Sequence, residues 1–147
     1  MYHVNARDLP GNDVSRTFEG GRHGPCTVSF FLVHNQPGQG PNLHRHAYDE
    51  TFVILEGRVL VRVGDESLEG GPGDIVIGPA GTPHGFTNRG PGPARLVCIH
   101  AAPAMSVSPG SRSGRCATTA RSNRARALRS SPARSTGLRR WTGRWTA

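Results

Sequence analysis

The sequence predicts an all-β fold, a sandwich or barrel of short strands, followed by a basic and disordered C-terminal tail. Runs rich in valine, isoleucine, phenylalanine and leucine recur between clusters of glycine and proline, which is a β pattern. No window of the first 104 residues sustains the apolar period of about 3.6 residues that a helix requires. Many short strands with evenly spaced turns are typical of sandwiches and barrels, so helix is expected to be a minor component.

Five apolar runs are predicted to be strands, and turn residues bound each of them. These runs cover residues 27–34, 51–57, 58–64, 73–78 and 94–100. In the third run Val59, Val61 and Val63 recur at the period of two that a half-buried strand shows. The Gly-Asp-Glu segment at 64–66 predicts a hairpin turn, and the clusters QPGQGPN, EGGPG and NRGPGP predict loops between strands.

The charge divides the chain into two parts. The 147 residues suffice for one compact domain. Residues 1–104 hold eight arginines and ten acids, a net charge of −2, whereas residues 105–147 hold ten arginines and no acid, a net charge of +10. We therefore expect one domain over 1–104 and a separate tail over 105–147. Nucleic-acid binding is not expected except through that tail.

The tail is built mainly of arginine, serine, alanine, threonine and glycine. It has too few large apolar residues to offset its chain entropy, so we predict that it is disordered. Three explanations stay open: a plain solvated tail, an arginine-rich arm for nucleic acid or an acidic surface, or a GC-rich gene translated out of frame. A check of the DNA or transcript for a shifted frame near codon 102 would decide the third.

The N-terminal segment and the cysteines bear on the location of the protein. No basic region followed by an apolar stretch begins the sequence, and no apolar run approaches the roughly 20 residues that span a bilayer. Cys26, Cys98 and Cys116 are widely separated and odd in number. We expect a cytoplasmic protein that does not enter a membrane, with Cys98 buried as a packing residue.

The segment PNLHRHAYDE, residues 41–50, has the chemistry of a chelating site. In an extended strand His44 and His46 share one face while Arg45 points to the other. Glu50 follows four positions after the second histidine and offers a carboxylate for a mixed nitrogen and oxygen site. Asp49 is expected to face elsewhere.

A second segment, GPAGTPHGFTN, offers one more ligand. Pro79, Gly81 and Pro83 predict a tight turn that presents His84 at the start of the next strand. Asn88, four residues later, is expected to be a strand-end or turn residue and not a ligand.

The spacing of these residues resembles the two motifs of the cupin family. Residues 38–57 fit G-x5-H-x-H-x3-E-x6-G, and residues 73–88 fit G-x5-P-x-G-x2-H-x3-N, with every fixed position filled. The 15 residues between the motifs match small single-domain cupins. The resemblance implies a double-stranded β-helix, or jelly-roll barrel, that is often a homodimer. It also implies a metal held by the same four side chains, His44, His46, Glu50 and His84.

Five further residues are candidates for lining a substrate pocket. His100 ends the last predicted strand and His34 ends the first. Tyr48 lies between the histidine pair and the glutamate, where its hydroxyl could reach a ligand or a substrate. Phe52 and Phe86 belong either to the core or to the apolar wall of a pocket, which the sequence alone does not decide.

The donor set predicts one divalent transition metal: Fe, Mn, Ni, Co or Zn. Three imidazoles and one carboxylate leave an octahedral ion two open positions, which suits chemistry better than a closed structural site. Glu50 is also a candidate general base, because it is the one acid among these ligands. The expected function is an enzyme acting on a small oxygenated organic molecule, foremost an oxygenase of dioxygenase type, then an isomerase or polyketide cyclase. The alternative is a non-catalytic protein that binds or senses a metal or small molecule.

Overall fold

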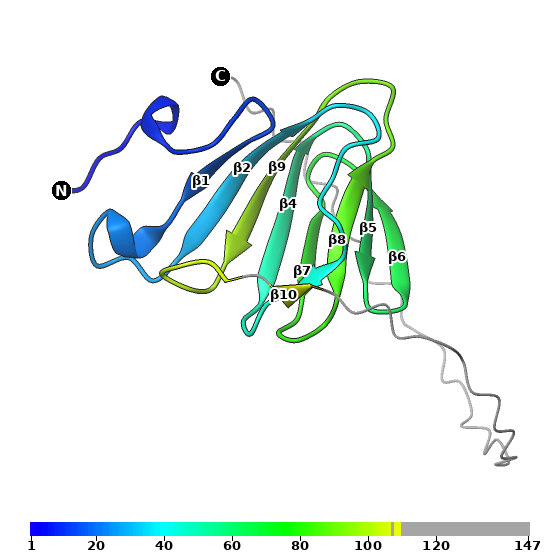
Figure 1. The fold of residues 1–147 in the computed structure, drawn as a ribbon. Helices are drawn as coiled ribbons and strands as arrows, with labels where there is room; N and C mark the ends of the chain where they lie inside the picture. The colour runs from blue at the N-terminus through cyan, green and yellow to red at the C-terminus, as the bar shows by residue number, and fades with distance from the viewer. Residues whose placement is uncertain (107, 110–147) are drawn as a thin grey trace, which may run out of the picture. The chain divides into compact units, whose positions relative to one another are not determined.

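Two five-stranded antiparallel sheets form the computed structural model, which describes residues 1–106 and 108–109. The first sheet has the order β1-β2-β9-β4-β7 and the second β10-β3-β8-β5-β6, and Figure 1 shows them as two layers. The strands are β1 (Ser15–Phe18), β2 (Ser29–Asn35), β3 (His44–Arg45), β4 (Glu50–Glu56), β5 (Val59–Val63), β6 (Glu66–Gly70), β7 (Ile75–Gly78), β8 (His84–Asn88), β9 (Ala94–His100) and β10 (Ser108–Pro109). Within the described residues the helical elements are two 3-10 turns, Ala6–Asp8 and Gly20–Arg22.

The all-β prediction is confirmed, and each of the five predicted runs overlaps a strand to within two residues at either end. The hairpin at 64–66 is also present, because β5 and β6 pair with Val63 opposite Glu66. Gly64 in that turn has φ of +59°, a conformation that glycine adopts without strain. Strand β1 was not predicted, since SRTF is short and carries no run of apolar residues.

The core lies between the two sheets and takes alternate residues from the strands of both. Phe52 and Ile54 of β4 are fully buried, and the register places them beside Cys98 and Leu96 of β9. Side chains from β5 and β8 complete the cluster from the second sheet. Burial of one such side chain stabilises the fold by about 1.5–3 kcal/mol. Glu50 has the same parity as Phe52, so the strand that builds the core also points the carboxylate inward.

Residues beyond 104 contact the barrel. Strand β10 pairs with β3, with Ser108 opposite Arg45. The backbone N–H of Met105 donates to Glu19 Oε1 over 3.2 Å. The barrel thus uses part of the predicted tail, while the prediction of disorder falls mainly on residues 107 and 110–147, which lie outside the described residues. In the part that the structure describes, no helix is long and apolar enough to cross a membrane.

Candidate metal centre

Three imidazoles and one carboxylate meet between the two sheets. His44 begins β3, Glu50 begins β4 and His84 begins β8, while His46 follows β3 directly. His44 and His84 are paired across β3 and β8, which brings residues 40 positions apart in the sequence into register. One ligand atom from each of the four residues lies within 4.8 Å of the others. The four ligands predicted from the sequence are therefore neighbours in space.

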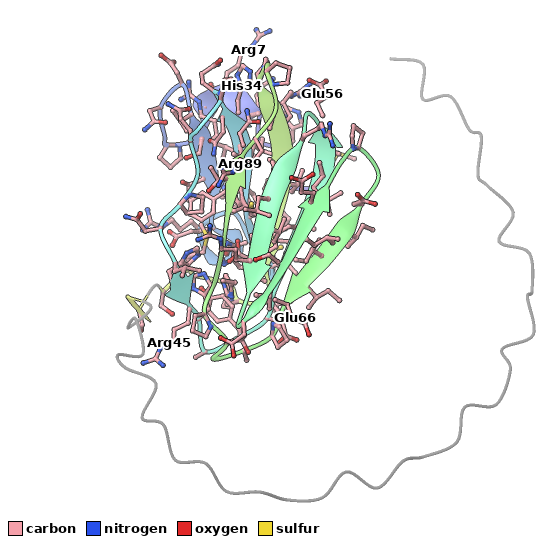
Figure 2. The ribbon with its side chains drawn as sticks, turned by 90° about the vertical axis from the view of Figure 1, so that its right-hand side faces the viewer. Arg7, His34, Arg45, Glu56, Glu66 and Arg89 are labelled. Carbon is pink, nitrogen blue, oxygen red and sulfur yellow. The ribbon has the colours of Figure 1, made fainter. Side chains whose placement is uncertain are left out.

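The carboxylate occupies the centre of this cluster. Glu50 Oε2 lies 2.9 Å from Nε2 of His84, 3.1 Å from Nε2 of His46 and 3.5 Å from Nε2 of His44. All but His44 are buried, and His44 is half-buried. Arg45, which separates the two histidines in the sequence, is exposed and projects outward (Figure 2), as the alternation along a strand predicts. Asp49 is exposed and accepts a hydrogen bond from the backbone N–H of Ala80 over 2.8 Å.

The outer nitrogens of two histidines are held by backbone carbonyls. His44 Nδ1 donates to the carbonyl of Asn42 over 2.7 Å, and His46 Nδ1 donates to the carbonyl of Ser106. The proton is then on Nδ1, which leaves the lone pair of each Nε2 free to bind a metal. Sequence reasoning missed Ser106, because it is 60 residues from His46 and carries no metal-ligating side chain.

Tyr48 packs against His46 and also contacts Ser106, the residue whose carbonyl holds His46. Its ring stacks on that of His46 with 5.0 Å between centroids and an interplanar angle of 8°. Its hydroxyl accepts from the backbone N–H of Ser106 over 2.8 Å and donates to the carbonyl of that residue over 3.2 Å. Tyr48 therefore ties the segment after β9 to the metal centre.

His84 is placed by the turn before it. Gly81 in that turn has φ of +74°, and its N–H donates to the carbonyl of His46 over 2.7 Å. Gly78 lies against the imidazole, and a Cβ there would approach His84 Nδ1 to 2.8 Å. Asn88, at the other end of β8, donates to the carbonyls of Asn35 and Gly92, both over 2.9 Å. As expected, it closes a turn and does not approach the cluster.

The residues present fit a divalent transition metal. His46 Nε2 is buried, lies among the other ligand atoms and has no hydrogen-bond partner. A buried nitrogen without a partner is costly unless something else satisfies it. Three neutral imidazoles and one carboxylate are donors that Fe, Mn, Ni, Co and Zn accept. The cluster can thus hold one such ion, and its chemistry leaves the choice among these metals open.

The charges of the cluster shift two of its pKa values. In the metal-free protein, burial alone would raise the pKa of Glu50, but hydrogen bonds from protonated Nε2 atoms of His44 and His84 and the nearby imidazoles lower it to about 2. The hydrogen bond to Glu50 raises the pKa of His44 in spite of burial, with help from the carbonyl of Asn42. Glu50 is therefore ionised at neutral pH, as a metal ligand must be.

His100 lies next to the cluster and outside the predicted ligand set. Its Nε2 is 3.5 Å from Glu50 Oε1, and neither ring nitrogen has a hydrogen-bond partner. Burial lowers the pKa of His100 to about 4, although the charge of Glu50 acts in the opposite direction. The imidazole is therefore neutral at pH 7, and its ring lies edge-on to Phe31 at 5.4 Å.

A cavity of about 450 Å³ opens beside the ligands. It is lined by Val14, Ser15, Phe31, Val33, Asn35, Gln39, Gly40, Pro41, His44, Glu50, Phe86 and Cys98. Of the five predicted pocket residues, Phe86 lines this cavity. Phe52 is in the core, edge-on to Phe86 at 5.8 Å, while Tyr48 and His100 flank His46 and Glu50 without lining the cavity.

The structure corrects the placement of His34. It is exposed on the outer face of β2, at the end of the barrel where Glu56 also lies, whereas Arg45 lies at the opposite end (Figure 2). Alternate residues of a strand face opposite sides. Val33 and Asn35, the neighbours of His34, are the residues that line the cavity.

The metal-free protein is expected to lose stability in acid through His100. The pKa of His100 is about 4 in the folded protein and 6.5 ordinarily. The folded protein therefore has its full free energy of unfolding, as far as His100 is concerned, above pH 6.5, and loses part of it as the pH falls from 6.5 to 4. The loss is roughly 3 kcal/mol in the free energy of unfolding. Protonation of Glu50, whose pKa is also lowered, reduces the free energy of unfolding further only below pH 4.5, the ordinary pKa of a glutamate.

Urea unfolding of the chelator-treated protein at pH 7 and pH 4 measures this effect. His100→Gln is the control, because glutamine does not titrate, and it should lose roughly 3 kcal/mol less than the parent between the two pH values. An equal loss in the parent and the variant would exclude His100 as the source.

Comparisons with known proteins agree with the fold and with the resemblance to the cupin motifs. The family model for the cupin domain matches residues 31–100. The uncharacterized protein MJ1618 of Methanocaldococcus jannaschii is 39% identical over 57 residues, which are 38% of this chain and 46% of that protein. The chain thus spans less than half the length of this curated relative. TT1209 from Thermus thermophilus is 30% identical, with a TM-score of 0.55 over 69% of this chain and 98% of that one.

Two enzymes of known structure share the fold at lower identity. The polyketide cyclase RemF from Streptomyces resistomycificus is 22% identical, with a TM-score of 0.57 over 68% of this chain and 78% of that one. Oxalate decarboxylase of Bacillus subtilis, which has Mn(II) centres, is 19% identical, with a TM-score of 0.65 over 72% of this chain and 30% of that one. Motifs, topology and family match coincide over the same residues, and the chain therefore belongs to the cupin family.

Proposed function

We propose that this cupin is a metal-dependent enzyme that acts on a small oxygenated organic molecule, foremost as an oxygenase of dioxygenase type. The observation that carries the proposal is the cavity of about 450 Å³, which shares two of its lining residues, His44 and Glu50, with the ligand set. A pocket that opens directly onto a metal lets a substrate reach the open positions of that ion. A purely structural site would be closed by protein ligands.

The residues of the chain have separate roles in this proposal. His44, His46, Glu50 and His84 hold the ion, and the carbonyls of Asn42 and Ser106 keep two imidazoles in the ligating tautomer. Fe, Mn, Ni or Co would supply redox chemistry at the substrate oxygens, whereas Zn would polarise a carbonyl or activate water. The mostly apolar walls of the cavity lower the local dielectric and so strengthen electrostatic interactions there.

The related folds support more than one reaction class. An oxalate oxidase is among the similar structures and supports the oxygenase candidate, and an oxalate decarboxylase shares the same fold. RemF is a polyketide cyclase and supports the second candidate, an isomerase or cyclase. At identities of 22% or less these likenesses concern the fold, so the metal and the reaction have to come from experiment.

Elemental analysis followed by oxygen uptake tests the proposal. The purified protein should hold about one transition-metal ion per chain and consume oxygen with a substrate from a library of small diols, enols and keto acids. His44→Ala should do neither. Binding of a library member without its conversion would favour the non-catalytic alternative, and conversion without oxygen uptake would favour an isomerase or cyclase.

We further propose that two copies of the chain associate through the outer face of the first sheet. Ile75 and Ile77 of the edge strand β7 are 65% and 58% exposed, and Leu55 on the neighbouring strand β4 is 45% exposed. Exposed apolar residues grouped on an edge strand favour binding to another apolar surface. A second copy of the chain offers such a surface, namely the same strand β7.

Light scattering of the purified protein checks this association. The parent should have twice the chain mass of 15.7 kDa, and Ile77→Asp should have the mass of a single chain. Leu68→Asp is the matched control, because Leu68 is 52% exposed on an edge strand of the other sheet and should leave the dimer intact. A monomeric parent, or a dimeric Ile77→Asp, would exclude this interface.

We also propose that the protein works in the reducing cytoplasm. Cys26 and Cys98, the cysteines within the described part of the chain, are not joined in a disulfide. Burial raises the pKa of the Cys98 thiol well above its usual value, with help from the charge of Glu50, so that it serves as a packing residue.

A further inference from the structure

Residues 101–106, which we call the clasp, follow β9 and are hydrogen-bonded to the segment that links β1 to β2. The N–H of Gly21 donates to the carbonyl of Pro103 over 2.8 Å. The N–H of Met105 donates to Glu19 Oε1 over 3.2 Å. Glu19 lies 86 residues before Met105 in the sequence, so only the folded barrel brings the two together.

The last residue of the clasp, Ser106, contacts the metal centre. Its carbonyl accepts a hydrogen bond from His46 Nδ1. Its N–H donates to the hydroxyl of Tyr48 over 2.8 Å, and that hydroxyl donates to the carbonyl of Ser106 over 3.2 Å. The ring of Tyr48 also stacks on the imidazole of His46. The orientation of this one candidate ligand is therefore set by the clasp and by the tyrosine that holds the clasp.

The two ring nitrogens of His46 connect the clasp to the ion. Nε2 is buried among the ligand atoms and has no hydrogen-bond partner, while Nδ1 donates to the clasp. An ion bound at Nε2 draws electron density from the ring and makes the N–H at Nδ1 a stronger donor. The carbonyl in turn makes Nε2 a more basic ligand and fixes the direction of its lone pair. Two binding events that favour each other do so by the same factor in both directions.

We propose that the clasp responds to the metal: an ion at His46 holds residues 101–106 closed, and the closed clasp tightens the binding of the ion. Tyr48 and Glu19 are positioning residues in this proposal, because they contact the clasp and are not members of the ligand set. Loss of the ion then weakens contacts outside the metal centre, at Glu19 and Gly21. The inference rests on the metal binding in the proposed function and requires no particular reaction.

Amide hydrogen exchange of the full chain, followed by NMR with and without zinc, tests the effect of the ion on the clasp. Zinc should slow exchange at Met105 and Ser106 by about 10-fold, within the usual range of about 5-fold to 150-fold for two coupled sites. Arg89 is the control, since it follows β8 at the end away from His84 and its N–H donates to the carbonyl of Arg58 over 2.9 Å. Its exchange should change by less than about twofold, because this turn opens locally.

Zinc affinity, measured by competition with a chromophoric chelator, tests the effect of the clasp on the ion. Tyr48→Phe removes the hydroxyl and keeps the ring on His46, and Glu19→Ala removes the acceptor of the Met105 N–H. Each variant should bind zinc about 5-fold to 10-fold more weakly than the parent. Tyr2→Phe is the control for the first, because Tyr2 is 74% exposed. Glu19→Gln is the control for the second, because it keeps an oxygen acceptor, and both controls should match the parent within about twofold.

The possible failures are distinguishable. Glu19→Ala and Glu19→Gln both lose the ion pair with Arg22, so a difference between them reports the hydrogen bond to the clasp. Parent-like zinc affinity in both Tyr48→Phe and Glu19→Ala overturns the proposal, as does equal slowing of the Met105, Ser106 and Arg89 amides by zinc. Either result leaves the metal centre standing. If zinc does not bind the parent at all, the metal site fails, and the proposed function fails with it.

Discussion

Replacing His84 by alanine is expected to lower the metal affinity by about 1,000-fold or more, so that the purified variant holds no stoichiometric metal. Loss of a group that only hydrogen-bonds a metal ligand typically costs about 10-fold to 100-fold in affinity, and loss of the ligand itself should exceed that. His84 is fully buried, and its Nε2 makes the closest approach to Glu50, at 2.9 Å. His84→Ala therefore removes one of the four candidate ligands and leaves a buried gap beside Glu50.

Elemental analysis and competition with a chromophoric chelator measure this loss. His34→Ala is the matched control, since His34 is an exposed histidine on the outer face of β2 and should retain the metal content of the parent. Thermal unfolding of His84→Ala should be compared with the metal-free parent, so that loss of metal is distinguished from loss of the fold. Retention of stoichiometric metal by the variant would show that His84 is not a ligand.

The clustering of the four candidate ligands could be predicted because local geometry places these side chains. The strand alternation puts His44 and His46 on one face, and the turn before His84 has glycine and proline at the positions where the chain must bend. The spacing to Glu50 adds the carboxylate. Each of these features depends on residues within about ten positions of one another, and the family resemblance supplies the single long-range step, the pairing of His44 with His84.

The inner and outer faces of β2 could not be distinguished in the same way. Phe30 and Leu32 have one parity and Phe31 and Val33 have the other, so apolar residues occupy both faces of the strand. The period of two carries no information when both sets are apolar. His34 was therefore assigned to the pocket, although the neighbouring Asn35 is the residue that lines it.

The hydrogen bond that holds His46 could not be predicted from the sequence, for a different reason. Ser106 holds His46 Nδ1 through its backbone carbonyl, and a backbone group leaves no mark in the residue type. It also lies in the part of the sequence that its composition assigns to the tail. His100, which was predicted to line the pocket, comes close to Glu50 only because β9 pairs with β4, and that register is set by the whole sheet.

Replacing Glu50 by glutamine is expected to lower metal affinity about 100-fold, and excess metal is expected to restore turnover to within about tenfold of the parent. Glutamine keeps the shape of the side chain and removes the charge that three imidazoles surround. The prediction that Glu50 also acts as a general base requires a pKa near the working pH. The imidazoles instead lower the pKa of Glu50 to about 2, which makes it a good ligand and a weak base.

Metal content and turnover measured together over a metal titration separate the two roles. If Glu50 only binds the ion, the turnover of Glu50→Gln should follow its metal occupancy and reach within about tenfold of the parent at saturation, whereas loss of a general base costs about 100-fold to 10,000-fold. Turnover that stays more than about 100-fold below the parent at full occupancy would establish proton transfer by this carboxylate. In that case the pKa of Glu50 would have to rise when substrate binds, since a carboxylate held at a pKa of about 2 takes up a proton poorly at neutral pH.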